Sequence, residues 1–162
     1  MAIALSKSIV AVDFHQNGLT PKVCKSIMNI ISINESLIQF NLGSIKGANR
    51  NRLGRDGGLG VALGLSQGRS LIQQLSLRST TLGNEEIEAI AEALEDNLFV
   101  THLDFAMNRI EGSRGGQAIA KILMRQNQIK GGENIQDIVL AHNRLGPSGF
   151  QTLSVALLSP GV

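Results

Sequence analysis

One spacing of apolar residues recurs five times along this chain of 162 residues, and it restricts the possible fold more than any other feature. The motif is an apolar residue, two free positions, an apolar residue, one free position, an apolar residue, two free positions, an asparagine, one free position and an apolar residue. Its copies begin 28, 35, 28 and 35 residues apart, at Ile9, Leu37, Ile72, Val100 and Ile135. A fixed period of roughly 20 to 50 residues is the signature of a repeat architecture.

Each unit divides into a strand and a helix. Positions 4 and 6 of the motif are apolar and their neighbours are free, which is typical of a strand with one buried face. Further along, apolar residues recur every three or four positions, as at Ile87, Ile90 and Leu94, which predicts an amphipathic helix with Asn84 as its N-cap. Parallel strands joined by helices cross over right-handedly, so the repeats predict an α/β solenoid with an inner parallel sheet and outer helices.

Three segments carry a family resemblance: Val-Asp-Phe-His-Gln-Asn-Gly-Leu at 12–19, Leu-Asp-Phe-Ala-Met-Asn-Arg-Ile at 103–110 and Ile-Val-Leu-Ala-His-Asn-Arg-Leu-Gly at 138–146. They resemble ribonuclease-inhibitor-type leucine-rich repeats, and the resemblance covers all but the termini. It implies a short horseshoe, the leucine-rich-repeat solenoid, with five repeats. Members of this broad family act as enzyme inhibitors, GTPase activators, innate-immune sensors and actin-filament cappers.

The resemblance also implies that the motif asparagines satisfy backbone groups of the turns; these are Asn17, Asn51, Asn108 and Asn143. Two units depart from the pattern. Thr80 replaces the asparagine in the third unit, and because a hydroxyl has fewer hydrogen-bonding sites than an amide, we expect its turn to be less completely satisfied. An insertion precedes Asn51, which leaves the place of this residue in the ladder open.

The whole chain, 1–162, is expected to form a single leucine-rich-repeat domain with repeats starting near 9, 37, 72, 100 and 135. The two insertions of seven fall near 43–50 and 124–134. Five units exceed the roughly three that a solenoid needs for stability. The first strand begins close to the N-terminus and the last helix ends near Leu158, so we expect no polar cap at either end and docking of at least one end on a partner or a second copy.

The composition says more about the cellular compartment of the protein than about its binding partner. The 15 basic and 13 acidic residues give a net charge of only +2, which does not by itself indicate nucleic acid or a membrane surface. The lone cysteine, Cys24, argues against a disulfide framework and favours the cytoplasm; its helical phase predicts a buried apolar role. No targeting segment and no run of about 20 apolar residues is predicted, so we expect no membrane partner.

Strands in register place equivalent positions in columns on the concave face, and this face is the predicted site of protein binding. Its most promising anchors are Arg78, His102 and Met107, since Trp and Tyr are absent. The predicted contact residues on the concave face are Asp13, Gln39, Asn41, Gln74, Ser76, Arg78, His102, Asp104, Met107 and Asp137. A second predicted contact surface is the insertion loop, with Lys46, Arg50 and Arg52.

The sequence also contains features that catalytic, metal-binding and nucleotide-binding sites share. His102, Asp104 and Asp137 could form an acid–base or weak metal site, but an open arc offers no water-excluding pocket, so no catalytic residue, metal or cofactor is predicted. Glycines at 58–64 lack the dinucleotide-binding spacing and are interpreted as packing residues. The basic loop, extended by Arg55 and Arg69, is expected to meet an acidic protein, because no aromatic residues are interleaved to stack nucleic-acid bases.

The sequence therefore predicts a protein–protein interaction module and no enzyme. The leading hypothesis is a subunit or adaptor of a larger cytoplasmic or cytoskeletal assembly. The alternative, from the family resemblance, is a regulator of a client enzyme, either an inhibitor or a GTPase activator, with Arg78 or the basic loop in contact with the client. A homo-oligomer through the uncapped ends is a further possibility.

Overall fold

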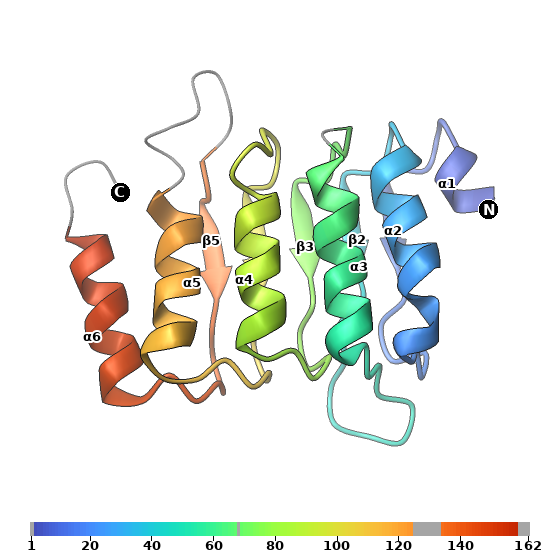
Figure 1. Cartoon of the computed structure of the whole chain (residues 1–162). Helices are drawn as coiled ribbons and strands as arrows, with labels where there is room; N and C mark the ends of the chain where they lie inside the picture. The colour runs from blue at the N-terminus through green and yellow to red at the C-terminus, as the bar shows by residue number, and fades with distance from the viewer. Residues whose placement is uncertain (1, 68, 125–133, 159–162) are drawn as a thin grey trace.

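A computed structural model describes residues 2–67, 69–124 and 134–158. Strands and helices alternate along the chain, as Figure 1 shows. The elements are α1 (Ala2–Leu5), β1 (Ala11–Asp13), the short 3₁₀ helix η1 (Pro21–Val23), α2 (Cys24–Ile33), β2 (Gln39–Asn41), α3 (Gly54–Ser66), β3 (Gln74–Ser76), α4 (Asn84–Ala93), β4 (His102–Asp104), α5 (Gly112–Met124), β5 (Asp137–Val139) and α6 (Gly146–Leu157).

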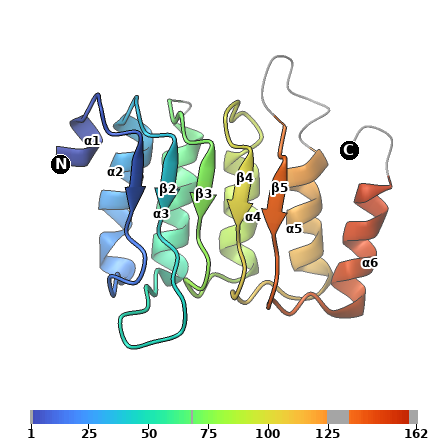
Figure 2. The same cartoon turned by 180° about the vertical axis from the view of Figure 1, so that it is seen from behind.

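The five strands form one parallel sheet in the order β1-β2-β3-β4-β5, and the helices form a second layer on one side of it (Figures 1 and 2). Each strand pairs with the next one in the chain with no shift between units. The first residues of the strands align as Ala11, Gln39, Gln74, His102 and Asp137, and the last as Asp13, Asn41, Ser76, Asp104 and Val139. The predicted α/β leucine-rich-repeat solenoid with five repeats is confirmed.

The core lies between the sheet and the helices. The middle residues of the inner strands, Phe40, Leu75 and Leu103, are at most 2% exposed. The equivalent residues of the edge strands, Val12 and Ile138, are only partly buried, because each lacks a neighbouring unit on one side. A single strand-and-helix unit therefore cannot bury its own apolar face, and the stack of units is what makes the core.

Motif asparagines join one unit to the one before it. The Asn51 amide, fully buried, accepts hydrogen bonds from the N–H groups of Asn17 and Leu19 and donates to the carbonyls of Phe14, Leu42 and Gly43. The insertion before Asn51 therefore does not displace it from the ladder.

The same five-bond pattern recurs two junctions further along, between the third and fourth units. Asn108 Oδ1 accepts from Thr80 and Leu82, and Nδ2 donates to Leu77, Phe105 and Ala106. Thr80 does not join two units in this way. Its hydroxyl donates to Leu77 O within its own unit, at 2.6 Å. The expected loss of hydrogen bonds therefore exists, but it affects the junction between the second and third units. The turn of the third unit itself is satisfied by Asn108.

Glycines in α3 bring two helices into contact. A Cβ on Gly60 would lie 2.7 Å from the Cys24 carbonyl oxygen of α2, and one on Gly64 would lie 2.7 Å from Ile31 Cβ. The interpretation of these glycines as packing residues is confirmed. Cys24 is only partly buried, so the prediction of full burial is wrong.

The start of α4 differs from the prediction. The N-cap is Gly83, whose N–H donates to Glu86 Oε2 at 2.6 Å. Asn84 is the first helical residue, and its amide instead bonds both the N–H and the carbonyl of Glu111 in the next unit. The prediction of Asn84 as the cap is wrong, because its amide is used between units.

The two ends of the solenoid are unlike. At the N-terminal end the apolar turn α1 packs on α2, and Asn34 Nδ2 donates to the carbonyls of Ile3 and Ser6. Leu5 and Val10 remain 64% and 57% exposed there, so α1 is not the polar cap of a typical solenoid end. At the other end α6 contacts α5 alone among the described elements. Its outer side exposes 68% of Phe150 and 84% of Leu158.

The first of the two predicted insertions lies within the described residues. Residues 43–50 form a loop at the edge where strands lead into helices, visible at the bottom of Figure 2. Most of the second insertion, 124–134, lies outside the described residues. Across the residues that the structure describes, no helix is both long and apolar enough to cross a membrane.

Candidate partner-binding surface

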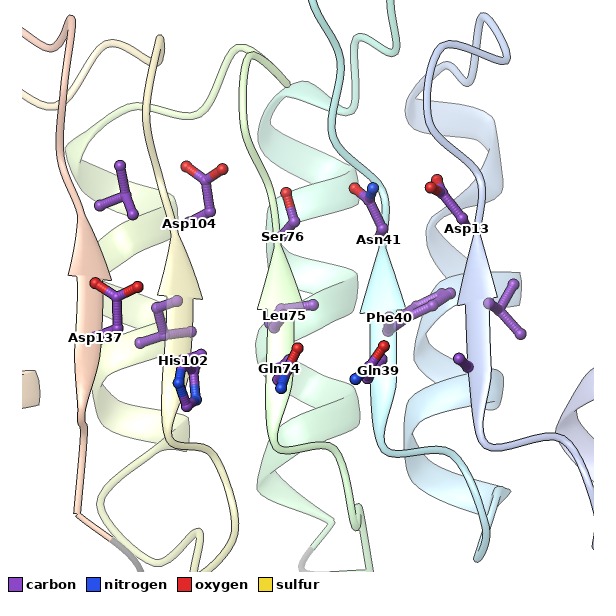
Figure 3. Close-up of a pocket in the computed structure, with 14 residues that line it drawn as sticks. Asp13, Gln39, Phe40, Asn41, Gln74, Leu75, Ser76, His102, Asp104 and Asp137 are labelled. Atoms are coloured by element: carbon purple, nitrogen blue, oxygen red, sulfur yellow. The ribbon is translucent and has the colours of Figure 1, made fainter.

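A groove of about 550 Å³ runs across all five strands on the face of the sheet opposite the helices (Figure 3). We call it the sheet groove. Its floor is formed by the middle residues of the strands and its two rows of side chains by the first and last residues. Eight of the ten predicted concave-face residues line it: Asp13, Gln39, Asn41, Gln74, Ser76, His102, Asp104 and Asp137.

The row at the strand ends has a structural role that sequence reasoning missed. Asp13 Oδ1 accepts a hydrogen bond from the His15 N–H at 2.6 Å. Asn41 and Asp104 accept from the N–H groups two residues further on, each at 2.9 Å. These are local turns of the kind that Asn and Asp form with their own backbone. The sequence pattern that indicates this role is an Asn or Asp at the end of the strand, two residues before the turn, in three of the units.

The row at the strand starts is freer to meet a partner. Gln39 and Gln74 are exposed, point into the groove, and have no side-chain hydrogen bond within the described part of the chain. Each amide offers both donors and an acceptor. His102 Nδ1 lies 2.8 Å from Thr101 Oγ1, which orients the ring, and Asp137 is its register partner on β5.

Two predicted anchors lie outside the sheet groove. Arg78 follows β3 and its Nη1 lies 3.7 Å from Asp104 Oδ2, with 34% and 27% of the two side chains exposed. Such a long, partly solvated pair holds the guanidinium weakly. Met107 has φ +58°, as a turn residue, and is partly buried beside the groove.

The three polar residues His102, Asp104 and Asp137 are divided within the groove, and only His102 and Asp137 are register partners. His102 and Asp104 stand at opposite ends of β4 (Figure 3), and the Asp104 carboxylate is used by Ala106 and Arg78. Within 2–67, 69–124 and 134–158, no three His, Cys, Asp or Glu side chains gather as metal ligands.

The insertion loop holds its three predicted contact residues differently. Lys46 and Arg52 are exposed. Arg50 is half-buried, and its Nε donates to the Ser79 carbonyl at 2.7 Å, across the junction of the second and third units. Burial lowers the pKa of Arg50, and the nearby charges of Arg52 and Arg109 lower it further. Arg50 is therefore partly a structural residue.

On the helical face, by contrast, three cations of α3 and α5 are paired with acidic residues at or near α4. Arg55 binds Glu85 through two nitrogens, Arg114 binds Glu88 in the same way, and Lys121 reaches Glu95 at 2.8 Å. The hydrogen bond from Arg114 lowers the pKa of Glu88, and Arg55 does the same for Glu85. Arg55, which the sequence places with the basic loop, is therefore already paired with an acidic residue of α4, 30 residues along the chain.

Comparison with known proteins gives a consistent fold. No family model matches the chain. The mouse (Mus musculus) NACHT, LRR and PYD domains-containing protein 12 is 27% identical over 161 aligned positions; the alignment covers 85% of this chain and 15% of that protein. Leiomodin-1 actin-binding site 2 superposes with a TM-score of 0.69 at 20% identity, over 96% of this chain and 85% of that one. The likeness shows a leucine-rich-repeat fold.

Proposed function

We propose that this chain is a protein-interaction module, an adaptor or subunit of a larger cytoplasmic assembly, built from repeats of the ribonuclease-inhibitor type in a single domain over 1–162. The sheet groove is the observation that carries the proposal. Five strands in unbroken register hold its side chains on a rigid surface. A surface that is already ordered loses little conformational freedom on binding, which favours affinity.

Gln39 and Gln74 are the proposed contacts at the centre of the groove. They are register partners on β2 and β3, both exposed, with their hydrogen-bonding groups open to a partner. The structural neighbour is titled an actin-binding site, so actin is the first partner to test. The groove offers no enclosed pocket for a reaction, and we propose a binding role without catalysis.

Site-specific crosslinking tests the proposal. A photo-reactive amino acid replaces Gln74 in one variant and Gln117, an exposed residue of α5, in the matched control. We expect a defined protein adduct from Gln74 in native extract or with purified actin, and none from Gln117. Equal crosslinking at both positions, or none at Gln74, contradicts groove binding.

A second candidate function is regulation of a client enzyme. The weak pairing of Arg78 with Asp104 favours it, because a guanidinium held at 3.7 Å is available to a client at little energetic cost. Client activity measured with Arg78→Ala should lose its dependence on this protein, and Arg78→Lys should restore only part of it, because lysine cannot bind a carboxylate in a bidentate manner. Unchanged regulation in Arg78→Ala rejects the candidate.

Self-association is also part of the proposal, now restricted to one end. Phe150 on α6 is 68% exposed and Leu158, directly after the helix, is 84% exposed, so this end is the surface for a second copy. Light scattering should show a dimer that Phe150→Ser disrupts; a monomer at all concentrations rejects this part.

A further inference from the structure

Cations gather along the edge of the sheet where the strands lead into the helices. We call this the basic edge; it consists of Lys46, Arg50, Arg52, Arg109 and Arg144. Three of these arginines directly follow a motif asparagine, in the second, fourth and fifth units. Their placement along one edge follows from the repeat and not from any single loop, with Gly18 and Thr81 at the same position in the first and third units.

Backbone hydrogen bonds fix that placement. The N–H of Arg52 donates to Leu19 O, that of Arg109 to Leu82 O and that of Arg144 to Ile110 O, at 2.7 to 2.8 Å. Each bond ties the residue after the asparagine to the end of the preceding motif. The three side chains leave the backbone at equivalent points and are all exposed.

The charges of the basic edge are not neutralised in the way those of the helical face are. No ion pair involves Lys46, Arg52, Arg109 or Arg144 among residues 2–67, 69–124 and 134–158, whereas Arg55, Arg114 and Lys121 all have one. The cations are also close enough to affect each other, since Arg52 and Arg109 lower the pKa of Arg50. An anionic partner would relieve this repulsion.

The helices add to the positive potential. α3, α4, α5 and α6 begin at this same edge, the lower one in Figures 1 and 2; the first turns of α3 and α4 contain Asp56, Glu85 and Glu86. The N-terminal end of a helix carries about half a positive charge. The first turns of α5 and α6, beside Arg109 and Arg144, contain no acidic residue. Glu111, directly before α5, is the acidic residue nearest to these two in the sequence.

From this arrangement we infer that the basic edge binds an acidic segment, rich in Asp and Glu, of a protein partner. The inference rests on the proposed function only in taking the partner to be a protein. A protein segment is favoured over single-stranded nucleic acid because the basic edge contains no aromatic side chain on which a base could stack. The partner would extend along the edge, from the insertion loop to the fifth unit.

Binding of a fluorescein-labelled deca-glutamate peptide, followed by anisotropy, tests the inference. Arg52→Gln/Arg144→Gln should weaken binding about tenfold, because two contacts between exposed unit charges are lost. The matched control, Arg55→Gln/Arg114→Gln, removes the same charge from the helical face and should leave binding within about twofold. Binding should also weaken as salt is raised, because exposed charges are screened.

Three outcomes overturn the inference. One is the absence of peptide binding at low salt, another is equal weakening by both double variants, and the third is tighter binding of a deca-thymidine oligonucleotide than of the peptide, which would indicate nucleic acid. Circular dichroism of each variant verifies folding. Because the groove test uses Gln74, on the face of the sheet, a failure there and a failure here are separate results.

Discussion

Two neighbouring junctions of the solenoid are built from different parts. Between the third and fourth units a single buried amide, Asn108, makes five hydrogen bonds. Between the second and third units Thr80 makes one, within its own unit. At this junction the insertion loop supplies other hydrogen bonds. Ser44 Oγ accepts from the Asn51 N–H at 2.7 Å, and Arg50 Nε donates to Ser79 O in the third unit. The insertion and the threonine are thus complementary changes.

The second–third junction also contains an unsatisfied polar group and a strained backbone conformation. The Ser79 hydroxyl is buried, and no hydrogen-bond partner for it exists among the described residues. Thr81 has φ +69°, a conformation that a β-branched residue rarely adopts. The comparison teaches that a repeat can lose one ladder residue when a loop supplies substitutes, although part of the stability is lost.

Asn108→Ala is expected to give the largest effect. It leaves the N–H groups of Thr80 and Leu82 and several carbonyls buried without partners, which should lower the free energy of unfolding by about 4 kcal/mol. Urea denaturation followed by circular dichroism measures this. Asn17→Ala is the matched control, since Asn17 is exposed and makes one hydrogen bond, to His15 O. Equal losses in the two variants would contradict the role assigned to Asn108.

Arg50→Ala should come next, with a loss of about 1–2 kcal/mol, because the carbonyl of the buried Ser79 loses its charged donor. If loop and threonine are complementary, Thr80→Asn should stabilise the protein by about 1 kcal/mol and reduce the effect of Arg50→Ala. A double-mutant cycle by urea denaturation measures the coupling. If the effects of Arg50→Ala and Thr80→Asn on the free energy of unfolding are strictly additive, the loop does not replace the missing amide. Lys46→Ala, in the exposed loop, is the control.

Thr81→Gly is expected to stabilise the protein by about 1 kcal/mol. Glycine adopts a positive φ without the steric penalty that threonine has, although the hydrogen bond from Thr81 Oγ1 to Thr80 O is lost. The first unit has Gly18 at the equivalent position, with φ +65°. Thermal unfolding should show a higher Tm for Thr81→Gly and a lower one for Gly18→Thr. A lower Tm for Thr81→Gly would refute the strain argument.

The smallest effect concerns the outer face at the third–fourth junction. Because Arg114 lowers the pKa of Glu88 below its ordinary value of 4.5, this pair contributes stability above about pH 4.5 that is lost as the pH falls further. Glu88→Gln should therefore lower the Tm slightly at pH 7 and leave it unchanged at pH 3. Glu111→Gln, with no ion pair in the described residues, is the control. A Tm difference that persists at pH 3 would contradict this assignment.

The concave columns were predictable because their register follows directly from the repeat: once five motifs are aligned, parallel strands can pair in one way that keeps every apolar residue inside. The second role of Asp13, Asn41 and Asp104 was not read from the sequence, because an Asp or Asn at a strand end is compatible with both a partner contact and a local turn. The pairing of Arg55 with Glu85 could not be predicted either, since it depends on how α3 and α4 face each other.

The sequence by itself determined the unit, its number, the parallel order of the strands and the buried positions, because these depend on a periodicity that local residues carry. Only the tertiary structure decided which charges are paired and which turn lacks its amide. Those outcomes depend on contacts between side chains about one repeat apart, whose distances no local pattern fixes. The helical face and the basic edge have similar cations in the sequence, and it is the neighbouring unit that neutralises one and not the other.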